Sequence, residues 1–434
     1  MRPELWFYSP QFSPRLEYVL DFVFNSVLKY KLHRTKSIPE INHKKKSEKV
    51  FLINYSTECI NGAFQIKPHD FLFKTNGFNY RLIKSESYYG TLVGDTFTES
   101  SDLFTSVFYF ISRAEEWQQR KRDAHNRFYD QSIDATEFDF SEPYVDIWID
   151  EFRLKLNEFF LDLNLQQPEF KTVYTFDIDN AFAFKGRSLC TTVFGLMKDV
   201  LFLKGGMLKQ RCRVVLGISN DPFDVYKNLL SYIIQKKLDS RFFFLINRKT
   251  SWDKGARIHS KAFKNLITLF KPHAQVCGVH PSYISSENTE LIEQESKTFS
   301  DLFGVNTIQS RQHFLKFNIQ STPIILNKAG ISSDWSMGFS DRIGFRARTT
   351  HAFKYYNFNT ETPEQLQFIP FCMMDGVFYI HGKIPLDEAL TQVSKIKERI
   401  RKLGGQCVFV FHERTFSELH HPGYSRFFYK ISEI

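Results

Sequence analysis

The chain has 434 residues, which is more than one average domain needs and favours two domains. Hydrophobic residues make up 42% and charged residues 24%, with only 20 Gly and 15 Pro, so the composition excludes a fibrous or wholly disordered chain. The net charge of +9 is modest, and much of the excess lies in residues 31–49, which lack hydrophobic periodicity. We expect a solvated loop there and no nucleic-acid partner; the alternative, nucleic-acid binding by this segment, would weaken steeply with salt.

The six cysteines are dispersed and form no Cys-x-x-Cys pair, which argues against a zinc ribbon or a disulfide framework. Buried free thiols in a reducing compartment fit this pattern better. The N-terminal residues show no apolar stretch followed by a small-residue cleavage site. The longest apolar runs are far shorter than the ~20 residues of a membrane helix. The sequence therefore predicts a cytoplasmic protein without a transmembrane segment.

Hydrophobic periodicity in the first third of the chain predicts a small mixed α/β domain. Helical spacing occurs at 15–30, 102–117 and 145–161, and strand-like pieces occur at 50–53, 80–83 and 88–93. Periodicity fades between 123 and 143, and a new pattern begins after Pro168. We place the boundary near 165, which gives an N-terminal domain of unknown role at 1–165 and a second domain at 166–434.

The second domain alternates continuous apolar runs with amphipathic helices, a pattern typical of a parallel sheet or barrel covered by helices. Strands are expected at 173–178, 241–246, 274–280, 322–326, 368–374 and 406–411, and helices at 196–202, 262–270, 289–303 and 386–403. Working residues of such folds gather at the carboxyl ends of the strands.

Three of these strand ends carry polar side chains suited to metal and proton chemistry. Asp177 and Asp179 end the first strand, in TFDID, and both point to the same side because they are two residues apart. His280 ends the third, and His412 ends the last. One carboxylate can hold a metal while the other moves a proton. The alternative for an Asp pair at a strand end is a purely structural role, as a helix cap or a turn former.

From about residue 170 to 415, the chain resembles the polysaccharide deacetylase family, carbohydrate esterase family 4. The resemblance implies a distorted (β/α)7 barrel that removes acetyl groups from N-acetylated sugars with the help of a divalent metal. Zinc is the first candidate for that metal, and cobalt, nickel and manganese are the alternatives. The family's first motif matches TFDID, which implies that Asp177 is the catalytic base and Asp179 a metal ligand.

The second motif of the family is His-Ser/Thr-x-x-His. Here His280 supplies the first histidine, and Ile284 stands where the second is expected. The third motif starts with an arginine that orients the base, matched by Arg311, which we expect to form a bidentate pair with Asp177. His313 is the candidate for the missing imidazole ligand, with simple packing as its alternative.

The remaining motifs concern the substrate and the leaving group. SSDWSMGF echoes the fourth motif, which implies that Asp334 and Trp335 line the site or pack it. The fifth, an apolar strand ending in histidine, implies that His412 is the general acid, kept protonated by a neighbouring carboxylate. Arg346, in the basic loop SDRIGFRART, is a candidate for binding an anionic sugar or a phosphate-bearing carrier.

The segment SRAEEWQQRKRDAHNRF, at 112–128, resembles an uncharacterised domain that precedes deacetylase-like modules in some bacterial proteins. Its charged residues form either a polar site or, as we favour, a buried network that holds the domain together. These residues are Arg113, Glu115, Glu116, Asp123, His125 and Arg127.

The sequence thus predicts a metal-dependent hydrolase, an N-deacetylase acting on an N-acylated sugar or glycan intermediate. A cytoplasmic setting suits a nucleotide-linked or lipid-linked intermediate better than finished cell wall. The alternative is a catalytically inactive carbohydrate-binding or scaffolding relative, which the isoleucine at position 284 favours. Metal content discriminates between the two. The oligomeric state is left open.

Overall fold

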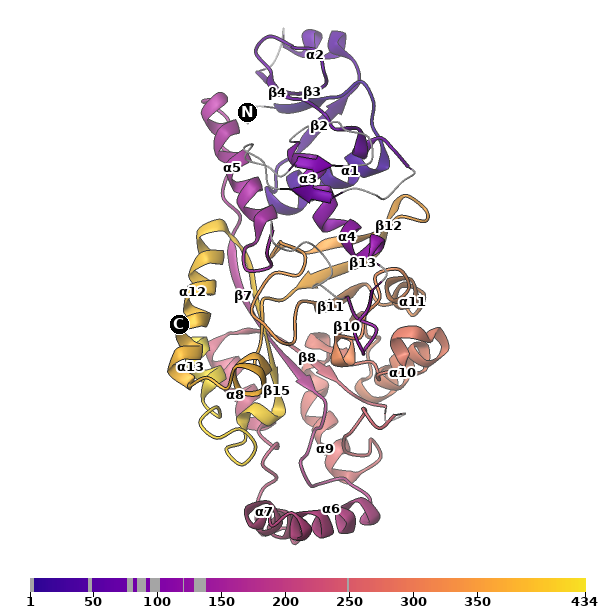
Figure 1. Cartoon of the computed structure of the whole chain (residues 1–434), viewed down its shortest axis with the longest axis vertical. Coiled ribbons are helices and arrows are strands. Elements are labelled where there is room, and N and C mark those ends of the chain that lie inside the picture. The colour runs from indigo at the N-terminus through magenta and orange to yellow at the C-terminus, as the bar shows by residue number, and fades with distance from the viewer. Residues whose placement is uncertain are drawn as a thin grey trace.

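The structure is a computed structural model, and it describes residues 4–45, 49–75, 81–83, 91–93, 102–119, 121–128, 138–247 and 250–434. The molecule is elongated (Figure 1). The N-terminal elements lie at one end and the large sheet lies in the middle, while α6 (Leu189–Leu201) and α7 (Gly205–Val215) lie side by side at the other end. No helix within the described ranges is both long and apolar enough to cross a membrane.

The N-terminal part contains a four-stranded parallel sheet in the order β2-β1-β3-β4. Its strands are β1 (Glu4–Tyr8), β2 (Leu32–Thr35), β3 (Val50–Tyr55) and β4 (Phe64–Ile66), and an antiparallel pair joins β5 (Arg81–Ile83) to β6 (Thr91–Val93). The helices are α1 (Pro14–Leu20), its π-helical continuation η1 (Asp21–Val27), α2 (Ile38–Lys44), the 3-10 turn η2 (Asp70–Leu72), α3 (Leu103–Ile111), α4 (Ala114–Gln118) and α5 (Tyr144–Phe159).

Most predicted elements of this part are present. The helix expected at 15–30 is α1 followed by η1, and the one expected at 145–161 is α5. The helix expected at 102–117 is divided into α3 and α4, because Arg113 between them is left-handed with a φ of 59°. The strands expected at 80–83 and 88–93 correspond to β5 and β6, although residue 80 and residues 88–90 lie outside the described ranges.

The second part is built on a nine-stranded sheet in the order β12-β13-β11-β10-β9-β8-β7-β15-β14. Among these described strands, every neighbouring pair is parallel except β12 with β13. The strands are β7 (Phe170–Ile178), β8 (Asp239–Phe244), β9 (Cys277–Val279), β10 (Gln309–Ser310), β11 (Ser333–Met337), β12 (Phe353–Asn357), β13 (Thr362–Pro370), β14 (Met373–Met374) and β15 (Gly405–His412).

Helices follow most of these strands and flank the sheet (Figure 1). Besides α6 and α7 they are α8 (Tyr226–Lys236), α9 (Lys261–Phe270), α10 (Thr289–Phe303), α11 (Thr322–Lys328), α12 (Leu386–Leu403) and α13 (Phe427–Glu433). Shorter turns of helix are η4 (Lys271–Val276), η5 (Ser285–Glu287), η6 (His313–Leu315), η7 (Val377–Gly382) and η8 (Glu413–Phe416). The parallel α/β class expected from the sequence is therefore present.

The strand order has two ends, β12 and β14, so the expected closure into a barrel stays a prediction. The segment between β13 and β14 nevertheless contacts two strands that lie far apart in the strand order, β11 and β15. The Phe371 N–H donates to the Met337 carbonyl on β11, and the Cys372 N–H donates to the Val408 carbonyl on β15.

One expected strand is wrong, and the one expected at 368–374 is divided between β13 and β14. Residues 322–326 form the start of α11 and not a strand. Pro323 lies in the first helical turn, where its missing N–H costs nothing. Thr322 and Leu326, four residues apart, are buried, whereas Ile324 and Ile325 are only partly buried. That spacing places the buried side chains on one face of a helix, and the short apolar run concealed it.

The hydrophobic core is continuous between the two parts of the chain, so the boundary at 165 remains a proposal. One buried cluster contains Leu5 and Phe104 from the N-terminal part together with Phe176 and Phe411 from the large sheet. All residues of α3 are buried.

A buried charge network also crosses between the parts, as we favoured for the 112–128 segment. Glu116 pairs with Arg113 at 2.7 Å and bidentately with Arg346 at 2.9 Å, and Glu115 pairs with Arg348 at 2.7 Å. Burial alone would raise the pKa of Glu116, but the charges of Arg346 and Arg113 outweigh burial and lower that pKa to about 2.

Candidate active site

Five of the six predicted catalytic and metal-binding residues line one cavity of about 560 Å³ at the carboxyl ends of the strands, and the sixth, Arg311, lies behind Asp177 and pairs with it. Asp177 is the second-last residue of β7, and Asp179 follows directly after that strand. His280 follows β9, and His412 ends β15. In the β7–β15 ladder His412 is the register partner of Asp177. Continuous burial of β7 and β15 fixes their register, and the register in turn fixes these side chains at one edge.

Three side chains form a group that can hold a metal ion: Asp179, His280 and His313. Each offers one ligand atom, and these atoms lie within 4.8 Å of one another. Nε2 of His280 lies 3.1 Å from Oδ1 of Asp179, and Nε2 of His313 lies 3.9 Å from the same oxygen. This Oδ1 is buried and accepts no well-formed hydrogen bond from the described residues. A buried, underused carboxylate oxygen facing two imidazoles fits a divalent cation.

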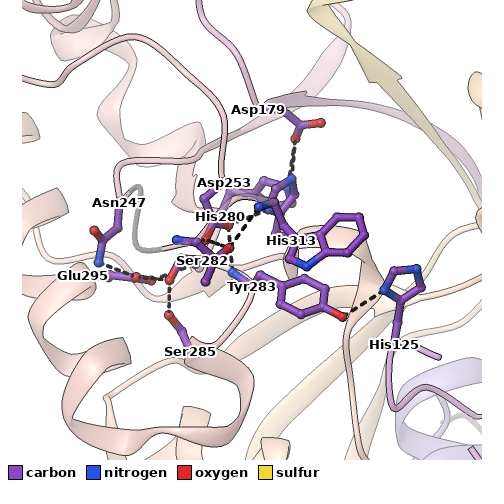
Figure 2. Close-up of polar contacts among 12 residues, drawn as sticks. His125, Asp179, Asn247, Asp253, His280, Ser282, Tyr283, Ser285, Glu295 and His313 are labelled. Atoms are coloured by element: carbon purple, nitrogen blue, oxygen red, sulfur yellow. Dashed lines mark hydrogen bonds and ion pairs between the residues drawn. The ribbon is translucent and has the colours of Figure 1, made fainter. Parts of the chain in front are cut away.

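The second nitrogen of each imidazole is already engaged, which orients the ring. Nδ1 of His280 lies 2.5 Å from the Arg311 carbonyl oxygen. Nδ1 of His313 lies 2.9 Å from Oδ1 of Asp253 (Figure 2). Metal-binding histidines typically use one nitrogen in this way and leave the other for the ion. The predicted role of His313 is therefore consistent with its geometry.

The loops that carry these histidines are tied down by buried carboxylates (Figure 2). Asp253 accepts hydrogen bonds from the Tyr283 N–H at 2.9 Å and from the Thr250 hydroxyl at 2.6 Å. Glu295 of α10 accepts from the Ser282 N–H at 2.9 Å. These contacts hold the turn after His280, so a rigid scaffold supports the candidate metal ligands.

Arg311 fixes Asp177, although not in the expected bidentate manner. Its Nη1 donates to Oδ1 of Asp177 at 2.9 Å and to the Thr175 hydroxyl at 2.7 Å. Its Nε donates to the Trp335 carbonyl at 2.9 Å, so only Nη1 contacts the Asp177 carboxylate. Both side chains of this ion pair are almost fully buried, so the cation holds Asp177 in one orientation.

His412 has the carboxylate neighbour that its proposed role requires. Nδ1 of His412 lies 2.7 Å from Oδ1 of Asp375, and Oδ2 of Asp375 accepts from the His412 N–H at 2.7 Å. Burial alone would lower the pKa of His412, but Asp375, assisted by Asp179, outweighs burial and the Arg414 cation and raises that pKa to about 9. His412 is therefore protonated at neutral pH.

The sequence reasoning missed Asp375, although the same rule would have found it. Asp375 follows β14 directly and is fully buried. The expected strand 368–374 also ends directly before Asp375, so its strand end carries a carboxylate as the others do. The structure divides this stretch, because β13 ends at Pro370 and β14 begins at Met373.

Arg414 is a second missed residue, and its position bears on metal binding. Its Nη2 lies 2.6 Å from Oδ2 of Asp179. Burial alone would raise the pKa of Asp179, but contact with His280 and the charges of His412, Arg414 and His313 lower that pKa well below its usual range. Arg414 thus occupies one oxygen of the candidate ligand carboxylate.

An aromatic wall of four rings borders the cavity: Trp252, Phe314 and His125 line it, and Tyr283 packs against all three. The Trp252 and Tyr283 rings stack with centroids 5.5 Å apart. Nδ1 of His125 lies 2.9 Å from the Tyr283 hydroxyl, and the imidazole stacks on Phe314. His125 and Arg127 come from the N-terminal part and line the cavity, and Asp123 pairs with Arg127 at 2.7 Å. The other three residues of the predicted polar segment, Arg113, Glu115 and Glu116, belong to the buried network.

The three predicted substrate-binding residues lie outside the cavity lining. Asp334 is fully buried and accepts from the Ser310 hydroxyl at 2.8 Å and the Ser336 N–H at 2.9 Å. Trp335 is buried and contributes its carbonyl to Arg311. The Arg346 guanidinium is paired with Glu116. All three side chains are buried away from the cavity, so the predicted direct contact with substrate has no support in this structure.

Comparison with known proteins gives limited information. Residues 5–161 match a family of unknown function, DUF7033, which is consistent with an N-terminal domain of unknown role. No curated protein matches the chain.

Two solved structures match this chain over 62% of its length. One, from Mycobacterium smegmatis, is assigned as a polysaccharide deacetylase; it is 13% identical with a TM-score of 0.40, and the match covers 62% of this chain and 83% of that one. The other is a polysaccharide deacetylase from Bacillus cereus, 14% identical with a TM-score of 0.30, covering 62% and 86%. Such low TM-scores do not bear on the chemistry, which rests on the side chains described above.

Proposed function

We propose that the second part of the chain is a metal-dependent hydrolase that removes an acyl group, typically acetyl, from an N-acylated sugar or glycan. The observation that carries this proposal is the convergence of a three-residue metal-ligand group and two ion pairs on one cavity. The metal-ligand group of Asp179 with His280 and His313 lies between the Asp177–Arg311 pair and the His412–Asp375 pair.

Asp179, His280 and His313 would hold the metal, for which zinc is the first candidate because of the mixed imidazole and carboxylate set. Bound there, the metal would act as a Lewis acid on the acyl carbonyl and on water.

Closure of the sheet into the barrel proposed above would proceed through Phe371 and Cys372, whose N–H groups donate to β11 and β15.

The remaining residues supply proton transfer. Asp177, oriented by Arg311, would take a proton from the attacking water. His412, protonated and held by Asp375, would donate a proton to the departing amine nitrogen. Because His412 and Asp177 are neighbours on adjacent strands, base and acid can reach opposite sides of one amide.

The aromatic wall suits the flat apolar face of a sugar ring. Trp252 and Phe314 are about half and one third exposed, and both border the cavity. Exposed aromatic side chains beside a polar centre commonly bind the apolar part of a ligand while polar groups orient it. We therefore place the sugar against Trp252 and Phe314, with its acyl group directed at Asp179.

A second candidate function is carbohydrate binding without hydrolysis. Two observations favour it: the ion pair of Arg414 with Asp179, and the isoleucine at position 284, which is exposed and away from the cavity lining. If the Arg414 guanidinium stays on Oδ2 of Asp179, it excludes a metal cation from that oxygen.

The release of acetate from a panel of N-acetylated sugars, with added zinc, tests the proposal. Wild type should release acetate, and Asp177→Asn and His412→Ala should each lower turnover about 10²–10⁴-fold while sugar binding changes much less. If wild type and both variants bind the same sugar equally and none releases acetate, the binding function replaces the hydrolase.

A further inference from the structure

The α6–α7 hairpin, residues 189–218, carries an unusual concentration of exposed large apolar side chains. They are Leu189, Val193, Phe194, Met197, Val200, Leu201, Phe202, Leu203, Val215, Leu216 and Ile218. Leu203 in the connecting turn is 92% exposed and Phe194 is 70% exposed. The hairpin lies at the end of the molecule opposite the N-terminal sheet (Figure 1). An apolar surface of this extent marks an interaction site.

A buried ion pair joins the two helices of the hairpin, and Val214 of α7 is its one buried apolar side chain. The one fully buried residue of α6 is Asp199, and it accepts a hydrogen bond from Nε of Arg211 on α7 at 2.7 Å. Gly195 lets the Arg211 guanidinium approach, since a Cβ there would lie 2.6 Å from it. The two helices are thus joined by an ion pair while the apolar side chains face outward. Such a helix needs an apolar medium on its outer face.

The exposed charges of the hairpin are positive. Lys198, Lys204, Lys209 and Arg213 are all exposed, whereas its acidic residue, Asp199, is buried and paired. A surface with apolar side chains between exposed cations matches an anionic membrane surface: apolar groups enter the acyl boundary while cations contact lipid phosphates.

We propose that the α6–α7 hairpin binds the protein to the surface of an anionic phospholipid bilayer. Phe194 and Leu203 enter the bilayer interface, and Lys198 and Lys204 contact the headgroups. A second copy of the chain is the less favourable occupant, because a two-fold contact through this face would oppose the same exposed cations. This inference is independent of the proposed hydrolase activity.

Co-sedimentation of the full chain with vesicles tests the proposal. The protein should pellet with vesicles of phosphatidylcholine mixed with phosphatidylglycerol and far less with phosphatidylcholine alone. The double variant Phe194→Ser with Leu203→Asn should bind about tenfold or more weakly, since each side chain loses its burial in lipid. Lys198→Gln should weaken binding about fivefold, and added salt should do likewise.

Leu161→Asn is the matched control, because Leu161 is 89% exposed but lies outside the hairpin. It should bind vesicles as wild type does. Circular dichroism should show all variants folded, since each changes an exposed side chain. The proposal is overturned if wild type ignores anionic vesicles, if the hairpin variant binds as well as wild type, or if Leu203→Asn instead converts a dimer to a monomer in sedimentation velocity without affecting vesicle binding.

Discussion

Asp375 shows how one buried carboxylate can set the protonation state of a catalytic group. It is fully buried, contacts both the ring and the backbone of His412, and sets that residue's pKa against the opposing effect of burial. A histidine with a pKa of about 9 stays protonated through neutral pH and loses its proton only in alkaline solution. The proposed acid is therefore ready to donate at neutral pH.

Asp375→Asn should shift the alkaline limb of activity. In wild type, kcat/KM should fall as pH rises through about 9, because His412 must be protonated. The variant lacks the carboxylate charge, so the pKa of His412 falls and the alkaline limb moves to lower pH. The pH profile of kcat/KM measures this. An unchanged alkaline limb in Asp375→Asn would show that His412 is not the group that titrates.

The candidate site residues at the strand ends could be predicted from the sequence, whereas the side chains that contact and orient them could not. Asp177, Asp179, His280 and His412 were predicted because a continuous apolar strand ends directly before or at each of them. Asp253 and Arg414 approach the site from loops or turns, and their contacts depend on tertiary packing that no periodicity reveals.

At the scale of elements, the aromatic wall joins three loops and the N-terminal segment 121–128. Trp252 follows β8, Tyr283 follows β9, and Phe314 lies in η6 with a left-handed φ of 59°. No sequence pattern predicts this wall, because its members are far apart in the chain. The α11 helix was mistaken for a strand for a related reason: a five-residue apolar run has too little length to reveal a helical period.

Trp252→Ala should raise KM for the sugar substrate more than it lowers kcat. The indole lies on the cavity wall, away from the proton-transfer pairs, and so contributes uniform binding. A loss of about 0.5–1.5 kcal/mol, or about 2- to 12-fold in KM, is expected for one aromatic contact. Steady-state kinetics measures the split. Trp252→Phe should retain most of the affinity, and a fall confined to kcat in Trp252→Ala would contradict the placement.

At the scale of the whole molecule, the N-terminal part and the large sheet are joined by buried charges and a continuous core. Glu116 balances Arg113 and Arg346, and all three side chains are nearly or fully buried. Removing one member of a buried ion group leaves uncompensated charge and costs about 3–5 kcal/mol. The N-terminal part is therefore coupled to the fold as well as to the cavity.

Glu116→Gln should strongly lower the free energy of unfolding, measured in urea. Since the pKa of Glu116 is about 2 in the folded chain and higher when unfolded, its contribution is fully present above the unfolded pKa and is lost as pH falls toward about 2. Glu142→Gln is the control, because Glu142 pairs with Arg399 at 2.8 Å across the same two parts but is exposed. It should cost at most about 1 kcal/mol. Equal costs for both variants would refute the buried network's role.

Equilibrium dialysis of the chelator-treated chain against zinc measures whether Asp179, His280 and His313 form a metal site. We predict one zinc per chain in wild type and in His125→Ala, whose imidazole lies on the aromatic wall. In His313→Ala, zinc affinity should fall about tenfold or more. Wild-type protein that binds no zinc, or a His313→Ala variant that binds it as tightly as wild type, would contradict the account.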